Sequence, residues 1–393
     1  MRFSSRARAI APFFAMEFAK RAAALEAQGH HVVKLNIGEP DFGAPPEVIA
    51  ALQAAAASPL PYTAASGLPA LRRAIAGFYG ERHDVDVDPA RVVVTAGASA
   101  ALLLVTAALV EPGDHWLVGD PSYPCNRQFL ASFGAEVELV PTDAGGRFQL
   151  DLAAVRARWT DRTRGLLVAT PSNPTGTSVP ASELAALCGW AREHGAWRIV
   201  DEIYLDLADP GPGGRPARSV LAIDADAVVV NSFSKFFGMT GWRLGWAVVP
   251  PAMAPVMERL AQNFYICPPT TSQVAALSAF TPGSLAVCEA RRAELRARRQ
   301  LVLDGLAAAG LSVPVPPDGA FYVYIDVSRT GLDSMTFCER ALAEAHVALT
   351  PGGDFGACGA AHHVRLSYAA SRDELAQGLG RLARFVASLA PAA

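Results

Sequence analysis

The chain has 393 residues, of which 18% are charged, and its formal net charge is −3 at pH 7. This balance argues against a nucleic-acid-binding surface and favours a small-molecule partner. The length is sufficient for more than one domain. The longest apolar run, residues 101–110, is too short to span a bilayer, so no membrane partner is expected.

Near the N-terminus, apolar residues recur at helical spacing between residues 11 and 30. Glu17, Lys20 and Arg21 interrupt this stretch too early for a secretory signal, so we predict an amphipathic helix ended by Gly29. The six cysteines form no CxxC pair and show no zinc-like spacing. They are typical of reduced thiols, which predicts a cytoplasmic protein.

Short β-rich runs then recur between residues 90 and 250, mostly separated by stretches with a helical pattern. The runs are 91–95, 115–120, 135–140, 165–170, 197–204, 227–233 and 243–250. This alternation predicts an α/β fold with a mainly parallel, seven-stranded sheet covered by helices. The connection before the seventh run is too short for a parallel crossover, so we predict that the last strand is antiparallel.

After residue 284 the pattern changes to a long Arg/Ala/Leu-rich helix at 285–310. A strand at 320–327, a helix at 334–345 and a terminal strand and helix follow. We predict a smaller α+β domain built from residues 1–44 and 285–393, beside a large domain of residues 45–284.

Open α/β sheets bind ligands at the carboxyl ends of their strands, so residues that follow the predicted strands are candidates for a site. Gly97, Ala98 and Ser99 follow the first run, where backbone N–H groups at a helix start could hold a phosphate or could simply pack tightly. The stretch "DEIY" (201–204) closes the fifth run. Its Asp201 is either a helix cap or surface-turn residue, or a carboxylate paired with a protonated ring nitrogen.

Lys235 follows the sixth run and is one of only three lysines, although lysine and arginine together number 34. A lysine after a strand usually lies in solvent. Where arginine is the default cation, however, a retained lysine indicates chemistry that arginine cannot perform. An amine with a lowered pKa attacks a carbonyl carbon, whereas a guanidinium keeps its proton.

The whole chain resembles the pyridoxal 5′-phosphate (PLP)-dependent aminotransferases of fold type I, class I/II, the group of aspartate and aromatic aminotransferases. The order and spacing of the motifs carry the resemblance. They are "LNIGEPDFGAPPEV", "YTAASGLPALRRAI", "TAGASAA", "PSYP", "PSNPTG", "DEIY", "SFSKFFGMTGWRLG", "PDGAFYVY", "PGGDFG" and "VRLSYA".

The resemblance implies an enzyme that moves an amino group from an L-amino acid to a 2-oxo acid. Lys235 would carry the cofactor as an internal aldimine and move a proton at the substrate Cα. Asp201 would pair with the pyridine nitrogen, and Asn173 and Tyr204 would bind the ring oxygen O3′. Tyr123 would stack on the ring, or it could only pack beneath its own loop.

The remaining implied contacts concern the phosphate and the substrate carboxylate. Positions that match the phosphate-binding residues are Gly97, Ala98, Ser99, Ser232 and Arg243. The carboxylate-binding positions are Arg365, whose fork suits a carboxylate, and Gly38, with Asn173 beside them. Tyr62 matches a tyrosine that reaches the phosphate in the neighbouring subunit, which implies a homodimer.

Three alternatives to an aminotransferase can be compared with the sequence. A carbon–sulfur β-lyase shares the framework and cofactor. A non-catalytic ligand sensor of a transcription regulator would need a DNA-binding module before Gly38, where the chain is too short for one. A dinucleotide-dependent oxidoreductase would need a GxGxxG after the first strand, which the sequence lacks.

Two further observations concern the charge of the amino donor and the question of a metal ion. The segment 265–273 has no basic residue at the place where the dicarboxylate-specific branch carries a second arginine, so a neutral, aromatic or broad range of amino donors is expected. His30 and His31, like His362 and His363, are adjacent in the sequence and would point to opposite faces of an extended segment. No metal site is predicted from them.

Overall fold

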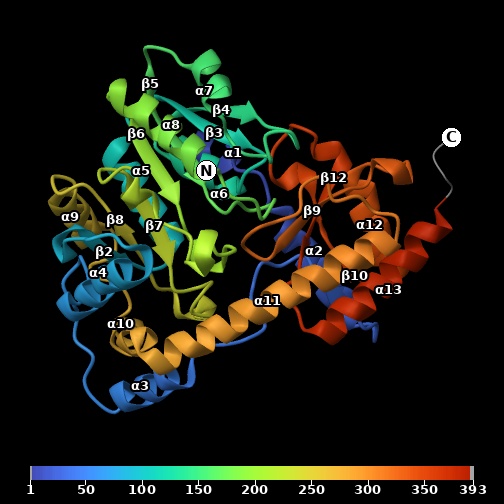
Figure 1. The fold of residues 1–393 in the computed structure, drawn as a ribbon, viewed down its shortest axis with the longest axis horizontal. Helices are drawn as coiled ribbons and strands as arrows, with labels where there is room; N and C mark the ends of the chain where they lie inside the picture. Colours follow the sequence, from blue (N-terminus) through green and yellow to red (C-terminus); the bar gives the residue numbers. More distant parts are fainter. Residues whose placement is uncertain (1, 390–393) are drawn as a thin grey trace.

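The computed structural model describes residues 2–389 and contains a large central sheet (Figure 1). Its strands lie in the order β2-β8-β7-β6-β5-β3-β4. They are β2 Val92–Thr95, β3 His115–Asp120, β4 Glu136–Pro141, β5 Thr163–Ala169, β6 Trp197–Asp201, β7 Val228–Ser232 and β8 Gly245–Val248. The predicted mainly parallel, seven-stranded sheet is confirmed.

β8 is the antiparallel strand. It lies between β7 and β2 and runs against both, with Ser232 opposite Gly245 and Thr95 opposite Gly245 on its other side. The short connection between β7 and β8 leaves no room for a parallel crossover, as the sequence predicts. The carboxyl ends of β2, β5, β6 and β7 therefore meet at one edge of the sheet.

Two predicted strands extend past a bend that limits the observed strand. β6 ends at Asp201 rather than residue 204, since the Asp201 carboxylate accepts a hydrogen bond from the Ile203 N–H and turns the chain. β8 begins at Gly245 rather than residue 243, because Arg243 has a left-handed backbone conformation with φ of 51°. Both differences place a predicted site residue at a bend.

Alternate residues of each strand enter two separate hydrophobic cores. In β2, Val92 and Val94 pack into one core with residues of α4 (Pro69–His83) and α8 (Ala181–Glu193), whereas Val93 packs into the other with residues of α5 (Ala98–Leu109) and α9 (Ala254–Phe264). The sheet is thus buried on both faces, as parallel sheets require.

The helices are α1 Ser5–Ala9, α2 Phe14–Glu26, α3 Pro46–Ala56, α4 Pro69–His83, α5 Ala98–Leu109, α6 Pro124–Ser132, α7 Leu152–Arg158, α8 Ala181–Glu193, α9 Ala254–Phe264, α10 Thr270–Ala276, α11 Pro282–Ala308, α12 Ser334–Ala345 and α13 Arg372–Ser388.

The smaller α+β part contains two further sheets. β1 (Val33–Lys34) pairs in parallel with β10 (Val347–Ala348), which joins the N-terminal segment to the C-terminal part of the chain. β9 (Tyr322–Asp326), β12 (His363–Ser367) and β11 (Thr350–Pro351) form an antiparallel sheet. The long helix α11 runs from α10 and α3 to this part of the molecule (Figure 1).

The N-terminal helix is also observed. α2 ends at Glu26, and the chain turns at Gly29, whose φ of 91° suits glycine. Across residues 2–389, none of the helices has both the length and the apolar character that a bilayer crossing demands.

Candidate active site

A cavity of about 240 Å³ opens at the carboxyl ends of β5, β6 and β7. Residues from the N-terminal segment, the large sheet and the C-terminal sheet line it together. The lining includes these predicted site residues: Gly38, Ala98, Ser99, Tyr123, Asn173, Asp201, Tyr204, Ser232, Lys235, Arg243 and Arg365. The structure thus brings together predicted site residues that lie up to 327 positions apart in the sequence, from Gly38 to Arg365.

Lys235 lies just beyond the end of β7, and its Nζ points into this cavity. The amine donates a hydrogen bond of 2.7 Å to the Gly38 carbonyl oxygen. Burial lowers the pKa of Lys235 to about 8, against an attraction from Glu39 that raises it, and Arg365 and Arg243 lower it further. A substantial fraction of the amine is therefore neutral, and able to attack a carbonyl, near pH 8.

Asp201 ends the neighbouring strand β6 and lines the same cavity. Within the described chain its carboxylate accepts one hydrogen bond, of 3.1 Å from the Ile203 N–H. Burial raises the pKa of Asp201 to about 7, although that hydrogen bond and Lys235 both lower it. A buried carboxyl group with so few donors suits a protonated ligand nitrogen, which would keep it ionised.

Small residues and one arginine surround the start of α5. Gly97 precedes this helix with φ of 89°, and a Cβ there would come within 2.6 Å of the Arg243 guanidinium. Gly97 does not line the cavity itself, but it allows Arg243 to approach the helix start. Ser232 and Ser234 lie opposite, with their hydroxyls 3.0 Å apart. A helix N-terminus, hydroxyls and a guanidinium form a suitable cradle for a phosphate.

Arg365, in β12, is only 2% exposed, yet its partners in the described chain are neutral. Its Nη1 donates to Asn173 Oδ1 at 2.8 Å, and its Nη2 donates to the Asn36 carbonyl and to Thr350 Oγ1. Its Nε has no hydrogen-bond partner among residues 2–389. A buried guanidinium with neutral partners and a free N–H fits an anionic group of a ligand.

The sequence did not identify Tyr322 as part of the site. Its hydroxyl lies 2.8 Å from that of Tyr204, and its ring centroid lies 4.5 Å from Cζ of Arg365. Gly38 allows this arrangement, because a Cβ at that position would collide with the Tyr322 hydroxyl. The motif "PDGAFYVY" was the available signal, but only the fold shows which of its aromatic residues faces the cavity.

Another wall of the cavity is mainly apolar. Phe13, Ala15, Met16 and Ile37 line it, and the Phe13 and Tyr123 rings meet edge to face at 6.1 Å. Among the described residues of the lining, the cations are those already placed, Lys235, Arg243 and Arg365. Tyr62 is 78% exposed and is not among the lining residues, which leaves its predicted contact with a second subunit untested.

The residues present fit PLP. Its aldehyde requires a buried amine, its pyridine nitrogen a buried carboxylate and its phosphate a polar cradle, and the cavity offers each of these groups. The unpaired Nε of buried Arg365 provides a further place for a carboxylate beside them.

Comparisons with known proteins agree with a PLP site in this cavity. The family model described as "Aminotransferase class I and II" matches residues 30–382. A valine–pyruvate aminotransferase of Mycobacterium tuberculosis is 41% identical over 96% of this chain and 97% of its own. An aspartate/prephenate aminotransferase of Thermus thermophilus is 38% identical over 97% and 98%. An arginine–pyruvate transaminase of Pseudomonas aeruginosa is 36% identical over 94% and 93%.

Solved structures show the same fold. The crystal structure of an aminotransferase from M. tuberculosis has a TM-score of 0.93 at 40% identity, over 99% of this chain and 100% of that one. Aspartate aminotransferase from T. thermophilus with maleate has a TM-score of 0.92 at 37% identity, over 98% and 100%. These relatives favour amino transfer over the lyase, sensor and oxidoreductase alternatives. The chain belongs to the class I and II aminotransferases and is a PLP-dependent aminotransferase.

Proposed function

We propose that Lys235 binds the cofactor covalently, that the substrate amino group displaces its Nζ, and that the freed amine then moves a proton to and from the substrate Cα. The observation that carries this proposal is the buried amine, with a pKa lowered to about 8, in one cavity with Asp201 and Arg365. When bound, PLP withdraws electrons from the substrate Cα. The Lys235 amine acts as the base held over that carbon.

In the same proposal, the ionised Asp201 carboxylate binds the pyridine nitrogen and keeps that nitrogen protonated. Asn173 and Tyr204 bind the ring oxygen O3′, and Tyr123 stacks on the ring. The phosphate-binding residues are proposed to be Gly97, Ala98, Ser99, Ser232 and Arg243, with Tyr62 from a second subunit. What supports this distribution is the placement of the amine, carboxyl and cradle at separate positions around the cavity.

Arg365 is proposed to bind the substrate α-carboxylate, with Asn173 and the Gly38 backbone beside it. The substrate side chain then faces Phe13, Met16 and Ile37. We propose an amino donor with a neutral, mainly apolar side chain, because these residues offer no charge to pair with a second carboxylate. The valine–pyruvate relative is consistent with such a donor, and its name suggests pyruvate as an acceptor to test first.

A donor screen with pyruvate as acceptor tests this specificity. We expect kcat/KM for valine or phenylalanine to exceed that for aspartate by about a hundredfold, because an unpaired buried carboxylate is strongly disfavoured. Asparagine is the matched control, since it has the shape of aspartate without the charge. A higher kcat/KM for aspartate than for valine and phenylalanine would contradict a neutral donor. Release of ammonia instead of amino transfer would indicate a lyase.

Cofactor capture should depend on pH through Lys235. Only the neutral amine attacks, so we expect the rate of covalent capture by cofactor-free protein to rise about tenfold per pH unit up to about pH 8 and then to level off. Stopped-flow absorbance after mixing with PLP measures this rate. If the rate kept rising towards pH 10, the amine would have the pKa of an exposed lysine and the burial argument would be wrong.

We also propose a homodimer, supported by the exposure of Tyr62 outside a cavity that it is expected to complete. Sedimentation of the holoenzyme as a single 41.3-kDa chain would contradict a homodimer.

The proposed domains are residues 45–284 and residues 1–44 with 285–393. Pairing of β1 with β10 supports this division, and separate calorimetric transitions would test it.

We propose a cytoplasmic location. The six free cysteines support it, and cell fractionation would test it.

A further inference from the structure

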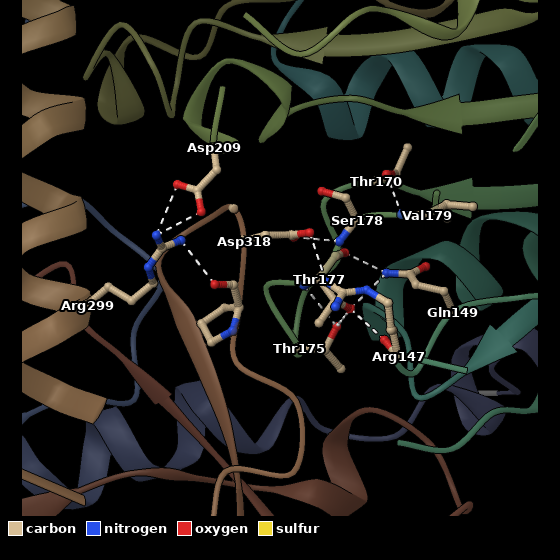
Figure 2. Close-up of polar contacts among 12 residues, drawn as sticks. Arg147, Gln149, Thr170, Thr175, Thr177, Ser178, Val179, Asp209, Arg299 and Asp318 are labelled. Atoms are coloured by element: carbon tan, nitrogen blue, oxygen red, sulfur yellow. Dashed lines mark hydrogen bonds and ion pairs between the residues drawn. The ribbon is translucent and has the colours of Figure 1, made fainter. Parts of the chain in front are cut away.

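Three chain segments that supply residues to the cavity meet at Asp318, outside the cavity lining (Figure 2). One segment is the turn 172–178, which carries Asn173. The second contains Tyr204 and continues to Asp209. The third is the loop that contains Asp318 itself and enters β9 at Tyr322.

Asp318 contacts the other two segments through its side chain and its backbone. Its Oδ1 accepts a hydrogen bond of 2.8 Å from the Ser178 N–H, and its Oδ2 accepts one of 2.8 Å from Arg147. Its own N–H donates to the Gly176 carbonyl, and its carbonyl accepts from the Asp209 N–H at 2.6 Å. Asp318 thus connects the turn of Asn173 to the segment of Tyr204.

The surrounding groups fix these segments further. Gln149 Nε2 donates to the Thr177 carbonyl oxygen and to Thr177 Oγ1. The Thr177 hydroxyl in turn donates to the Arg147 carbonyl. From the other side, Arg299 of α11 binds both carboxylate oxygens of Asp209, at 3.0 and 2.8 Å, and the Pro317 carbonyl (Figure 2). The cluster therefore links α11 to the turn of Asn173.

A glycine on each side permits the close approach. Gly176 has φ of 68°, and a Cβ there would lie 2.6 Å from the Tyr322 carbonyl oxygen. A Cβ on Gly319 would collide with Pro171. Backbone packs directly on backbone here, so a shift of the loop at Asp318 would move the turn of Asn173 as well.

We propose that Asp318 is a positioning residue for amino transfer. Its side-chain hydrogen bond to the Ser178 N–H, together with its backbone bonds to Gly176 and Asp209, holds Asn173, Tyr204 and Tyr322 in register. Asn173 contacts Arg365, and the hydroxyls of Tyr204 and Tyr322 contact each other, so one displaced loop disturbs the carboxylate end and the O3′ side of the cavity together. This proposal rests on the roles proposed above for those side chains.

The hydrogen bond to Ser178 is expected to matter more than the ion pair. The side chains of Arg147 and Asp318 are 37% and 36% exposed, and exposed ion pairs contribute little. Arg147→Gln is therefore a matched control that removes the ion pair and leaves the Ser178 bond intact. Asp318→Asn is the conservative variant, because its amide oxygen can still accept from the Ser178 N–H.

The test uses the holoenzyme, with each rate expressed per bound cofactor. For Asp318→Ala we expect KM for the amino acid to rise about tenfold, and the pH midpoint of the visible absorption of bound cofactor to shift by about half a unit or more. Both Arg147→Gln and Asp318→Asn should stay within about threefold of the wild-type KM, with an unchanged midpoint. Should Asp318→Ala not fold, Asp318→Ser replaces it, because the serine hydroxyl is one bond shorter than the carboxylate and does not reach the Ser178 N–H.

The proposal is overturned if Asp318→Ala, or Asp318→Ser in its place, only lowers the melting temperature and keeps the wild-type KM and pH midpoint. It is also overturned if Arg147→Gln reproduces the alanine effect, since the ion pair would then act instead. A wild-type protein without a visible band or amino transfer would reject the proposed function itself, which is a separate outcome.

Discussion

Replacing Lys235 with alanine is expected to abolish the visible absorption of bound cofactor and to lower kcat by roughly 10⁴-fold or more. Two functions would be lost at once, because the Lys235 amine is proposed both to hold the cofactor covalently and to move the proton at the substrate Cα. Absorbance of the purified variant with added PLP measures the first function. Single-turnover kinetics with an amino donor measures the second.

Lys235→Arg is the informative control for this prediction. Arginine restores the positive charge and much of the length but keeps its proton at every accessible pH, so it should be as inactive as alanine. Rates near those of the wild type in either variant would reject Lys235 as the reacting amine. A cofactor that remains covalently bound in Lys235→Ala would mean that another lysine holds it.

Arg365→Lys should raise KM for the amino donor by about a hundredfold, with a much smaller effect on cofactor binding. The buried guanidinium has neutral partners and one unpaired N–H, so a substrate carboxylate is the charge expected to complete it. Lysine keeps the charge but cannot present two parallel N–H groups. Titration of the visible band with amino acid, and separately with cofactor, distinguishes the two affinities.

Arg340→Lys is a suitable control, because Arg340 lies on α12 in an exposed pair with Glu344 and does not line the cavity. It should leave both affinities unchanged. If Arg365→Lys lost the cofactor before it lost affinity for the amino acid, the arginine would serve the cofactor rather than the carboxylate.

The sequence predicted the large sheet because its signals are local. Strands such as Val92–Thr95 are short and apolar, and the brief connection after Ser232 allows only an antiparallel return. The positions of Asp201 and Lys235 at strand ends follow from the same pattern. Strand ends were less accurate, since the bend at Arg243 depends on a left-handed backbone conformation that no propensity indicates.

Contacts between distant segments were not predictable from local pattern. Tyr204 and Tyr322 are 118 positions apart, and Asp318 acts on Ser178 across 140 positions. The pKa of Asp201 depends on how fully the fold buries its carboxyl group, which the sequence does not show. Tyr62 is proposed to complete the site of a second subunit, and a single chain does not display such a contact.

The relatives are named for amino donors of different kinds. Proteins named for valine, aspartate or prephenate, and arginine share 36–41% identity with this chain. Their common fold therefore fixes amino transfer without fixing the side chain that is accepted. In this chain the proposal of a neutral donor depends on a few residues, Phe13, Met16 and Ile37.

The most direct test of the central claim is to reduce the holoenzyme with borohydride, which makes the cofactor–lysine bond permanent, and to locate the label by peptide mass spectrometry. The chain has only three lysines, Lys20, Lys34 and Lys235, so the assignment is unambiguous. We expect the label on the peptide that contains Lys235. A label on Lys20 or Lys34, or no label on a protein that still transfers amino groups, would contradict the account.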